Sequence, residues 1–93
     1  HEWLYWHTSG GGKKFASILS DEMSASFPDM KARGAKPRTR NQRGSYLLRK
    51  VRPVAVIAEP FFGSNEEEWD MINHNRGALV GVYARAIEKF ADG

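Results

Sequence analysis

A short apolar run from Val54 to Ala58 ends in an acid, Glu59, and constrains the fold more than any other stretch. Short runs rich in β-branched residues are typical of strands that are buried on both faces, as in a parallel sheet. Ligands of α/β proteins bind in the crevice beyond the strand ends. We therefore predict a strand over residues 54–58, with Glu59 at the edge of a binding crevice.

The rest of the pattern predicts a mixed α/β domain. Aromatic residues near the start favour a strand, and apolar residues at helical spacing predict two long helices. Ser64 and Glu67 form a Ser-x-x-Glu capping box that predicts a helix start. The order strand, helix, strand, strand, helix, helix indicates an α/β fold with a mixed or mostly parallel sheet flanked by helices, here a partial domain. The expected elements are strands over 2–7, 46–51 and 54–58, and helices over 13–27, from 64 onward and over 76–90.

The helical spacing also predicts which side chains face the core. Trp69 and Ile72 should point inward from the helix after Ser64, and Asn75 should cap the last helix. The two long helices should bury Phe15, Ile18, Leu19, Glu22, Met23 and Ser26 in the first, and Leu79, Val82, Tyr83, Ala86, Ile87 and Phe90 in the last.

Two segments are expected to be loops. Residues 8–12 contain three consecutive glycines and predict a flexible connector. Residues 29–44 are polar and basic, and Gly34 and Pro37 interrupt any regular pattern. A long loop of this kind is either solvated or lines a groove for an anionic or carboxylate-bearing substrate. The basic side chains are Lys31, Arg33, Lys36, Arg38, Arg40 and Arg43.

Size and composition limit the function classes. The chain has 93 residues, so we expect one small domain, and it has no cysteine, which excludes disulfides and thiolate metal sites. No apolar run is long enough to span a membrane. The formal net charge of +3 fits an anionic partner, such as a nucleic acid or a cell-wall polymer, without choosing between them.

Glu59 is the candidate catalytic residue. A carboxylate at a cleft edge beside Phe61 and Phe62 suits a general acid or base, although it is equally well explained as a cap of local backbone amides. The histidines do not have the spacing of a zinc site. The three are His1, His7 and His74.

Residues 54–68 resemble the closing motif of zinc-dependent N-acetylmuramoyl-L-alanine amidases, the cell-wall amidases that include many phage endolysins. In that family an apolar strand ends in Glu and is followed by an aromatic residue, a small residue, Asn and acids that open a helix. Residues 2–7 and 13–16 are similar to the family's Glu-x-x-Tyr strand and the helix after it. Residues 33–36 and 46–49 match in order, so the resemblance covers nearly the whole chain.

The resemblance implies hydrolysis of the amide between the lactyl group of N-acetylmuramic acid and L-alanine in peptidoglycan. Zinc polarises the carbonyl and activates water, and Glu59 takes the proton from that water and passes it to the leaving amine. The family's zinc ligands, His, Glu and His, precede the strand matched by residues 2–7. We therefore expect residues 1–93 to be the C-terminal portion of the catalytic domain. The zinc ligands should lie outside the chain, on a companion N-terminal segment, and the isolated chain should be inactive.

Two other functions remain open from the sequence. A non-catalytic cell-wall-binding module would keep the fold without the metal, although the retained Glu59 argues against it. A small nucleic-acid-binding domain would explain the basic residues at 29–44, but no recognition motif or interleaved aromatic residue accompanies the charge. The cell wall is thus the expected place of action, and a nucleic acid is the least favoured partner.

Overall fold

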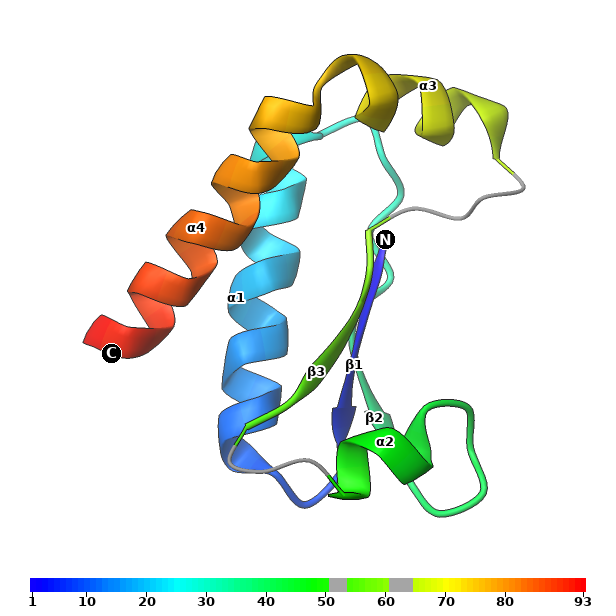
Figure 1. Cartoon of the computed structure of the whole chain (residues 1–93), viewed down its shortest axis with the longest axis vertical. Coiled ribbons are helices and arrows are strands. Elements are labelled where there is room, and N and C mark those ends of the chain that lie inside the picture. Colours follow the sequence, from blue (N-terminus) through cyan, green and yellow to red (C-terminus); the bar gives the residue numbers. More distant parts are fainter. Residues whose placement is uncertain (51–53, 61–64) are drawn as a thin grey trace.

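The computed structural model describes residues 1–50, 54–60 and 65–93, and within them a three-stranded mixed sheet is flanked by helices (Figure 1). This confirms the expected α/β class. In chain order the elements are β1 (Glu2–Trp6), α1 (Gly10–Ser26), β2 (Gly34–Arg38), α2 (Ser45–Lys50), β3 (Val56–Glu59), α3 (Glu66–His74) and α4 (Arg76–Asp92).

The sheet has the strand order β2-β1-β3, so the first strand of the chain is the central one. β1 is parallel to β2, and α1 makes the connection between them, as parallel neighbours require. β1 is antiparallel to β3, with Glu2 opposite Glu59 and Leu4 opposite Ile57. The C-terminal end of β3 therefore lies beside the N-terminal end of β1.

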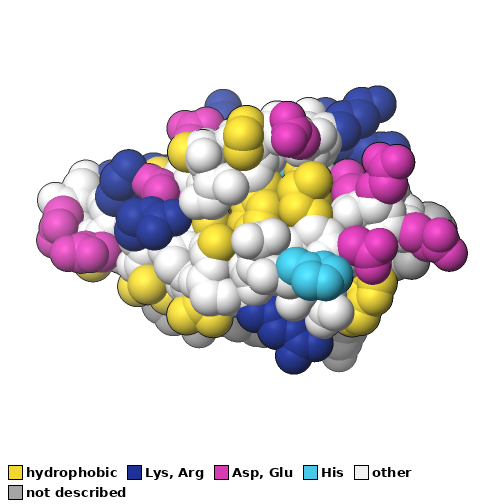
Figure 2. All heavy atoms as spheres, turned by 90° about the horizontal axis from the view of Figure 1, so that it is seen from above, with side chains coloured by type: hydrophobic (Ala, Val, Ile, Leu, Met, Phe, Trp, Pro, Cys, Tyr) yellow, Lys and Arg dark blue, Asp and Glu magenta, His cyan; other side chains and the backbone are white. Residues whose placement is uncertain are grey.

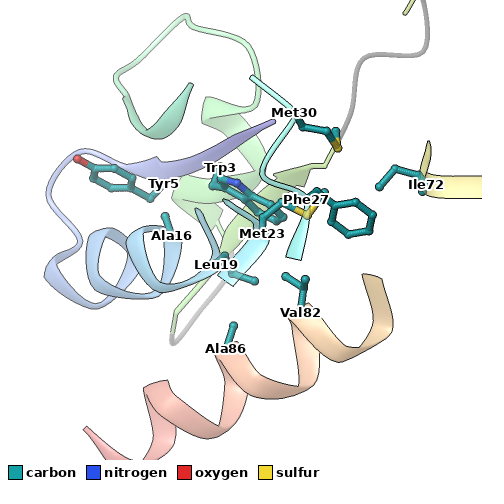
Figure 3. Packing of buried hydrophobic residues seen from close by; sticks show 10 residues of the cluster. All are labelled: Trp3, Tyr5, Ala16, Leu19, Met23, Phe27, Met30, Ile72, Val82 and Ala86. Atoms are coloured by element: carbon teal, nitrogen blue, oxygen red, sulfur yellow. The ribbon is translucent and has the colours of Figure 1, made fainter. Parts of the chain in front are cut away.

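The core lies between the sheet and two long helices. α1 lies along one face of the sheet, and α4 packs against α1 (Figure 1). Trp3 and Tyr5 point from β1 toward these helices, and the Trp3 ring meets the Tyr83 ring edge-on, with 6.1 Å between centroids. Figure 3 shows how the apolar side chains converge from both helices and from the segment after α1. The buried cluster consists of Trp3, Tyr5, Ala16, Leu19, Met23, Phe27, Met30, Ile72, Val82 and Ala86.

The expected strand over residues 46–51 is wrong, because Ser45–Lys50 is the helix α2. Leucine, arginine and lysine lose little side-chain freedom in a helix, and four of the six residues of α2 are of these types. The apolar pair Leu47 and Leu48 had suggested a strand. In the helix Leu48 is buried and Leu47 is exposed. Val51 lies outside the described residues.

The expected loop over residues 29–44 is wrong in part, because β2 lies inside it. Gly34–Arg38 pairs with β1 along the edge of the sheet, where Pro37 is tolerated because an edge strand has one unpaired side. Polar edge strands carry little apolar pattern of their own. Pairing with the apolar central strand decides their structure, and a sequence pattern does not show that pairing.

The glycines at 10–12 are also not a loop, because they form the first turn of α1. Ser9 caps this helix, since its hydroxyl accepts a hydrogen bond of 2.9 Å from the Gly12 amide. A Cβ at Gly12 would lie 3.2 Å from the Tyr5 Cβ. The glycine there allows α1 to pack closely against β1.

The C-terminal helices depart from the expected pattern at three residues. Trp69 is 46% exposed, because α3 extends away from the sheet (Figure 1) and reaches the core through Ile72, which is buried as expected. Ile87 is 58% exposed although Val82 and Ala86 of the same helix are buried. Asn75 precedes α4 as predicted, but its side-chain amide donates to the Met71 carbonyl at 2.8 Å and does not cap α4.

The N-cap of α3 lies one residue later than the sequence predicted. Its N-cap is Asn65, whose side-chain oxygen accepts a hydrogen bond of 3.1 Å from the Glu68 amide, while Ser64 lies outside the described residues. Glu66, Glu67 and Glu68 occupy the first turn, where the helix dipole favours negative charge. Acidic side chains accordingly gather at the α3 end of the surface in Figure 2. None of the described helices is long and apolar enough to cross a bilayer.

Candidate functional site

Glu59 is the last residue of β3 and lies opposite Glu2 of β1. Side chains of directly opposite residues in an antiparallel pair point to the same face of the sheet. Because Trp3 and Tyr5 face α1 and α4, the alternation along β1 places Glu2 on the other face. Two carboxylates therefore stand side by side at one end of the sheet, away from the main core.

Arg43 joins these two carboxylates. One of its terminal nitrogens, Nη1, donates to Glu59 Oε2, and the other, Nη2, lies 3.5 Å from Glu2 Oε2. The hydrogen bond to Glu59 first, and then the charges of Glu59 and Glu2, raise the pKa of Arg43 above its usual value, so the guanidinium is firmly positive. The side chain of Arg43 is 60% exposed, whereas those of Glu59 and Glu2 are 23% and 9% exposed. The arginine thus closes the outer side of a largely buried acid pair.

Arg38 approaches Glu2 from the neighbouring strand. Its Nη2 atom lies 4.0 Å from Glu2 Oε1, at the limit of an ion pair. Glu2 therefore stands between two arginines, one from β2 and one from the turn after it. We call the four residues Glu2, Arg38, Arg43 and Glu59 the sheet-edge cluster.

Two buried polar atoms of the sheet-edge cluster have no hydrogen-bond partner within the described part of the chain. They are Glu59 Oε1 and Arg38 Nε. Buried polar atoms are almost always paired, and an unpaired one calls for an explanation such as a bound water, an ion or a catalytic role. The cluster is therefore incompletely satisfied, unlike an ordinary structural ion pair.

The turn that carries Arg43 has a defined backbone. Thr39 and Gln42 hold it together, since the Thr39 amide donates to Gln42 Oε1 at 2.6 Å and the Gln42 amide donates to the Thr39 carbonyl at 3.2 Å. Asn41 and Gly44 take positive φ angles of 72° and 81°. A Cβ at Gly44 would lie 2.7 Å from Ile57 Cδ1, so glycine lets this turn lie against the sheet face that bears the cluster.

The histidines stand apart from this cluster. The Trp3 indole donates to His1 Nδ1 at 2.9 Å, and His1 Nε2 lies 3.3 Å from the Ser24 hydroxyl, so both ring nitrogens of the buried His1 have partners. His7 is exposed after β1 and stacks edge-on against Trp6. His74 is exposed and donates to the Asp70 carbonyl at 2.7 Å. Within residues 1–50, 54–60 and 65–93, no group of three or more His, Cys, Asp or Glu side chains is placed to hold a metal ion.

The structure thus places Glu59 at a strand end, as the sequence predicted, and brings Glu2, Arg38 and Arg43 to it. Phe61 and Phe62, expected beside Glu59, lie outside the described residues. The sequence pointed to Arg38 and Arg43 only as members of a basic segment, and to Glu2 only as part of a strand. Their meeting depends on the antiparallel pairing of β1 with β3, for which no local sequence signal exists.

Comparisons with protein-family models, with curated proteins and with solved structures find no match to this chain. Function is therefore inferred from the sheet-edge cluster and from the sequence resemblance.

Proposed function

We propose that this chain is part of a zinc-dependent N-acetylmuramoyl-L-alanine amidase and that Glu59 is its general base and acid. The observation that carries the proposal is the position of Glu59. Glu59, which the motif at 54–68 marks as catalytic, is a partly buried carboxylate at the C-terminal end of β3. A second carboxylate and two arginines lie beside it. Because β3 is antiparallel to β1, this position lies at the amino-terminal end of the parallel pair β1 and β2.

The reaction assigned to Glu59 is amide hydrolysis. Glu59 takes a proton from the attacking water while the water oxygen bonds to the lactyl carbonyl carbon of N-acetylmuramic acid. The carbon–nitrogen bond then breaks, and Glu59 returns the proton to the departing nitrogen of L-alanine. The products are a lactyl carboxyl group and a peptide with a free amino terminus.

The described residues do not fit a zinc site, because no three candidate ligands lie together among them. We therefore assign no step of this chain to the metal. The proposal requires that the zinc ligands lie on residues outside this chain, as the resemblance implies.

The test is a Glu59→Gln substitution in a protein in which an amino-terminal segment supplies the zinc ligands. Loss of the proton-transfer group should lower peptidoglycan hydrolysis by about 100- to 10,000-fold, measured as release of L-alanine amino termini, while binding to insoluble cell walls is retained. The control is Glu22→Gln, which changes a more buried, ion-paired carboxylate between α1 and α4, and it should keep activity within a few-fold. Undiminished hydrolysis by the Glu59→Gln protein would exclude the assigned role.

A second function is favoured by one contact. The ion pair between Arg43 and Glu59 is also what a structural carboxylate would make, and it fits a non-catalytic module that binds cell-wall peptides. Such a module would bind cell walls without hydrolysing them, even when an N-terminal segment is supplied. In that case the Glu59→Gln change should alter stability or binding and leave no catalytic effect to measure.

A further inference from the structure

Glu59 is only partly open to water in this structure, since 23% of its side chain is exposed. Its Oε2 atom accepts a hydrogen bond from Arg43, and its Oε1 atom is buried without a partner among the described residues. A general base needs one oxygen within hydrogen-bond reach of the proton that it takes. Release of Oε2 by Arg43 would free this oxygen for proton transfer, and the structure shows the arrangement in which Arg43 holds it.

Arg43 is well placed to move. Its side chain is the most exposed of the sheet-edge cluster, and among the residues that the structure describes its hydrogen bonds go to the two glutamates. The backbone of its turn is fixed by the Thr39–Gln42 hydrogen bonds. A change of side-chain rotamer thus moves the guanidinium without any rearrangement of the fold.

Glu2 keeps the guanidinium near the site. Its carboxylate is only 9% exposed and is fixed in the central strand, and it already lies 3.5 Å from Arg43 Nη2. Each of the two terminal nitrogens of Arg43 therefore has its own carboxylate. An incoming carboxylate that replaces Glu59 on Nη1 would leave the contact with Glu2 in place.

We propose that Arg43 restrains Glu59 through their hydrogen bond, and that a carboxylate-bearing peptide breaks this bond by competing for Arg43. We call this arrangement the latch. The peptide carboxylate takes the place of Glu59 on the guanidinium, Glu2 retains Arg43 at the site, and Glu59 Oε2 becomes open to water. A carboxylate is the fitting ligand because the planar guanidinium matches its two oxygens and holds carboxylates in the closed state. The catalytic consequence rests on the proposed amidase function. It specifies the substrate as an acyl peptide with a free carboxylate close to the scissile amide.

The binding part of this proposal is tested on the 93-residue chain alone. The probes are N-acetyl-L-alanyl-L-alanine, which has one carboxylate, and its C-terminal amide, which has none, titrated while NMR follows the Arg43 side-chain N–H and the Glu59 carboxyl carbon. We expect the carboxylate peptide to shift both signals with saturation, and the amidated peptide to bind at least about tenfold more weakly, as the loss of a charge-assisted hydrogen bond predicts. Equal binding of the two peptides, or no shift of the Glu59 signal, would overturn the latch.

A charge-matched control separates the latch from general attraction. Arg40 lies on the same turn and is exposed, so Arg40→Ala removes the same charge without touching the glutamates. Arg43→Ala should abolish the preference for the carboxylate peptide, and Arg40→Ala should preserve it. If both variants weaken binding alike, the effect is long-range electrostatics and the proposal fails.

Measurements of hydrolysis rates connect the latch to catalysis. They also distinguish failure of the latch from failure of the amidase function. In a protein completed with the zinc-ligand segment, Arg43→Ala should reduce the preference for free-carboxylate over amidated peptidoglycan at least several-fold, while Glu59→Gln loses activity on both. Absence of hydrolysis by the unaltered protein would contradict the amidase function and leave the peptide-binding result standing. Equal losses on both substrates in Arg43→Ala would contradict the latch and leave the amidase function standing.

Discussion

Two clusters of charged side chains in this protein look alike in composition and differ in how fully they are satisfied. The sheet-edge cluster surrounds Glu2 and Glu59. The second, which we call the helix cluster, comprises Glu22 and Ser26 of α1 and Arg85 and Lys89 of α4. Both contain a carboxylate side chain that is 9% exposed, in Glu2 and in Glu22, and an arginine that is about half exposed or more.

In the helix cluster each group has a partner of its own. Arg85 donates from Nε to Glu22 Oε2 at 3.0 Å and from Nη2 to the Ser26 hydroxyl at 2.8 Å, and Lys89 pairs with Glu22 Oε1. In the sheet-edge cluster two carboxylates share the exposed Arg43, and two buried atoms have no partner among the described residues. The first arrangement fixes α4 on α1. The second leaves a carboxylate that can change partners, and this is why we place the function there.

The sharpest test of the comparison removes the cations from each cluster. The double variant Arg85→Ala/Lys89→Ala leaves the Glu22 carboxylate without its described ion-pair partners, and a largely buried charge without a partner is costly. Allowing for the partial exposure of the site, we expect the free energy of unfolding to fall by about 2–3 kcal/mol, measured by urea denaturation. Removal of Arg43 should cost less, because Glu2 keeps Arg38 as a neighbour and the Glu59 side chain is 23% exposed. The control is Glu88→Ala, which changes an exposed residue of the same helix. Equal losses of unfolding free energy from the two clusters would refute the distinction between them.

The turn that carries Arg43 can be tested at its glycine. Gly44→Ala places a Cβ 2.7 Å from Ile57 Cδ1 at a φ of +81°, so Ile57 has to shift in addition to the backbone strain. We expect a loss of about 1–3 kcal/mol. Gly34→Ala has a similar φ of +76° and nothing within 4 Å, so it should cost only the backbone term of about 1 kcal/mol. Thermal or urea unfolding of the pair measures the difference, and a larger cost at Gly34 would contradict the close contact between the turn and the sheet.

A smaller effect should appear in the pH dependence of stability. Hydrogen bonds from Lys89 first and from Arg85 second hold the pKa of Glu22 below its ordinary value of 4.5. A carboxyl whose folded pKa lies below its unfolded pKa stabilises the fold above the unfolded value and loses that contribution as pH falls through the folded value. Stability should therefore decline below about pH 4.5, and Glu22→Gln should decline less steeply. Parallel acid unfolding curves for the two proteins would show that Glu22 contributes nothing to this slope.

The sequence predicted the elements whose periodicity is strong. The apolar positions of α1 and α4 marked Leu19, Met23, Val82 and Ala86 as buried, and each is buried. It failed for short segments, where periodicity has too few residues to distinguish a helix from a strand. Residues 45–50 form a helix, and the strand at 34–38 has no apolar pattern of its own.

The candidate site likewise divides into a part that the sequence predicted and a part that it did not. Glu59 could be singled out from the sequence, because an acid that ends an apolar strand is a local pattern. Arg43 could not be assigned to it, because six basic residues lie between positions 31 and 43 and nothing in the pattern distinguishes them. The structure selects Arg43 through the turn at 39–44, which turns this residue back over the sheet.

The sequence by itself determined the α/β class, the two helices that cover the core and the acid at the end of an apolar strand. These follow from hydrophobic periodicity and local turn chemistry, which act over a few residues. The tertiary structure alone decided that β1 is central, that β3 runs antiparallel to it, and that Glu2 and Glu59 share Arg43 across 57 positions of chain. Such pairing depends on which distant segments bury each other's surfaces, and no residue carries that information alone.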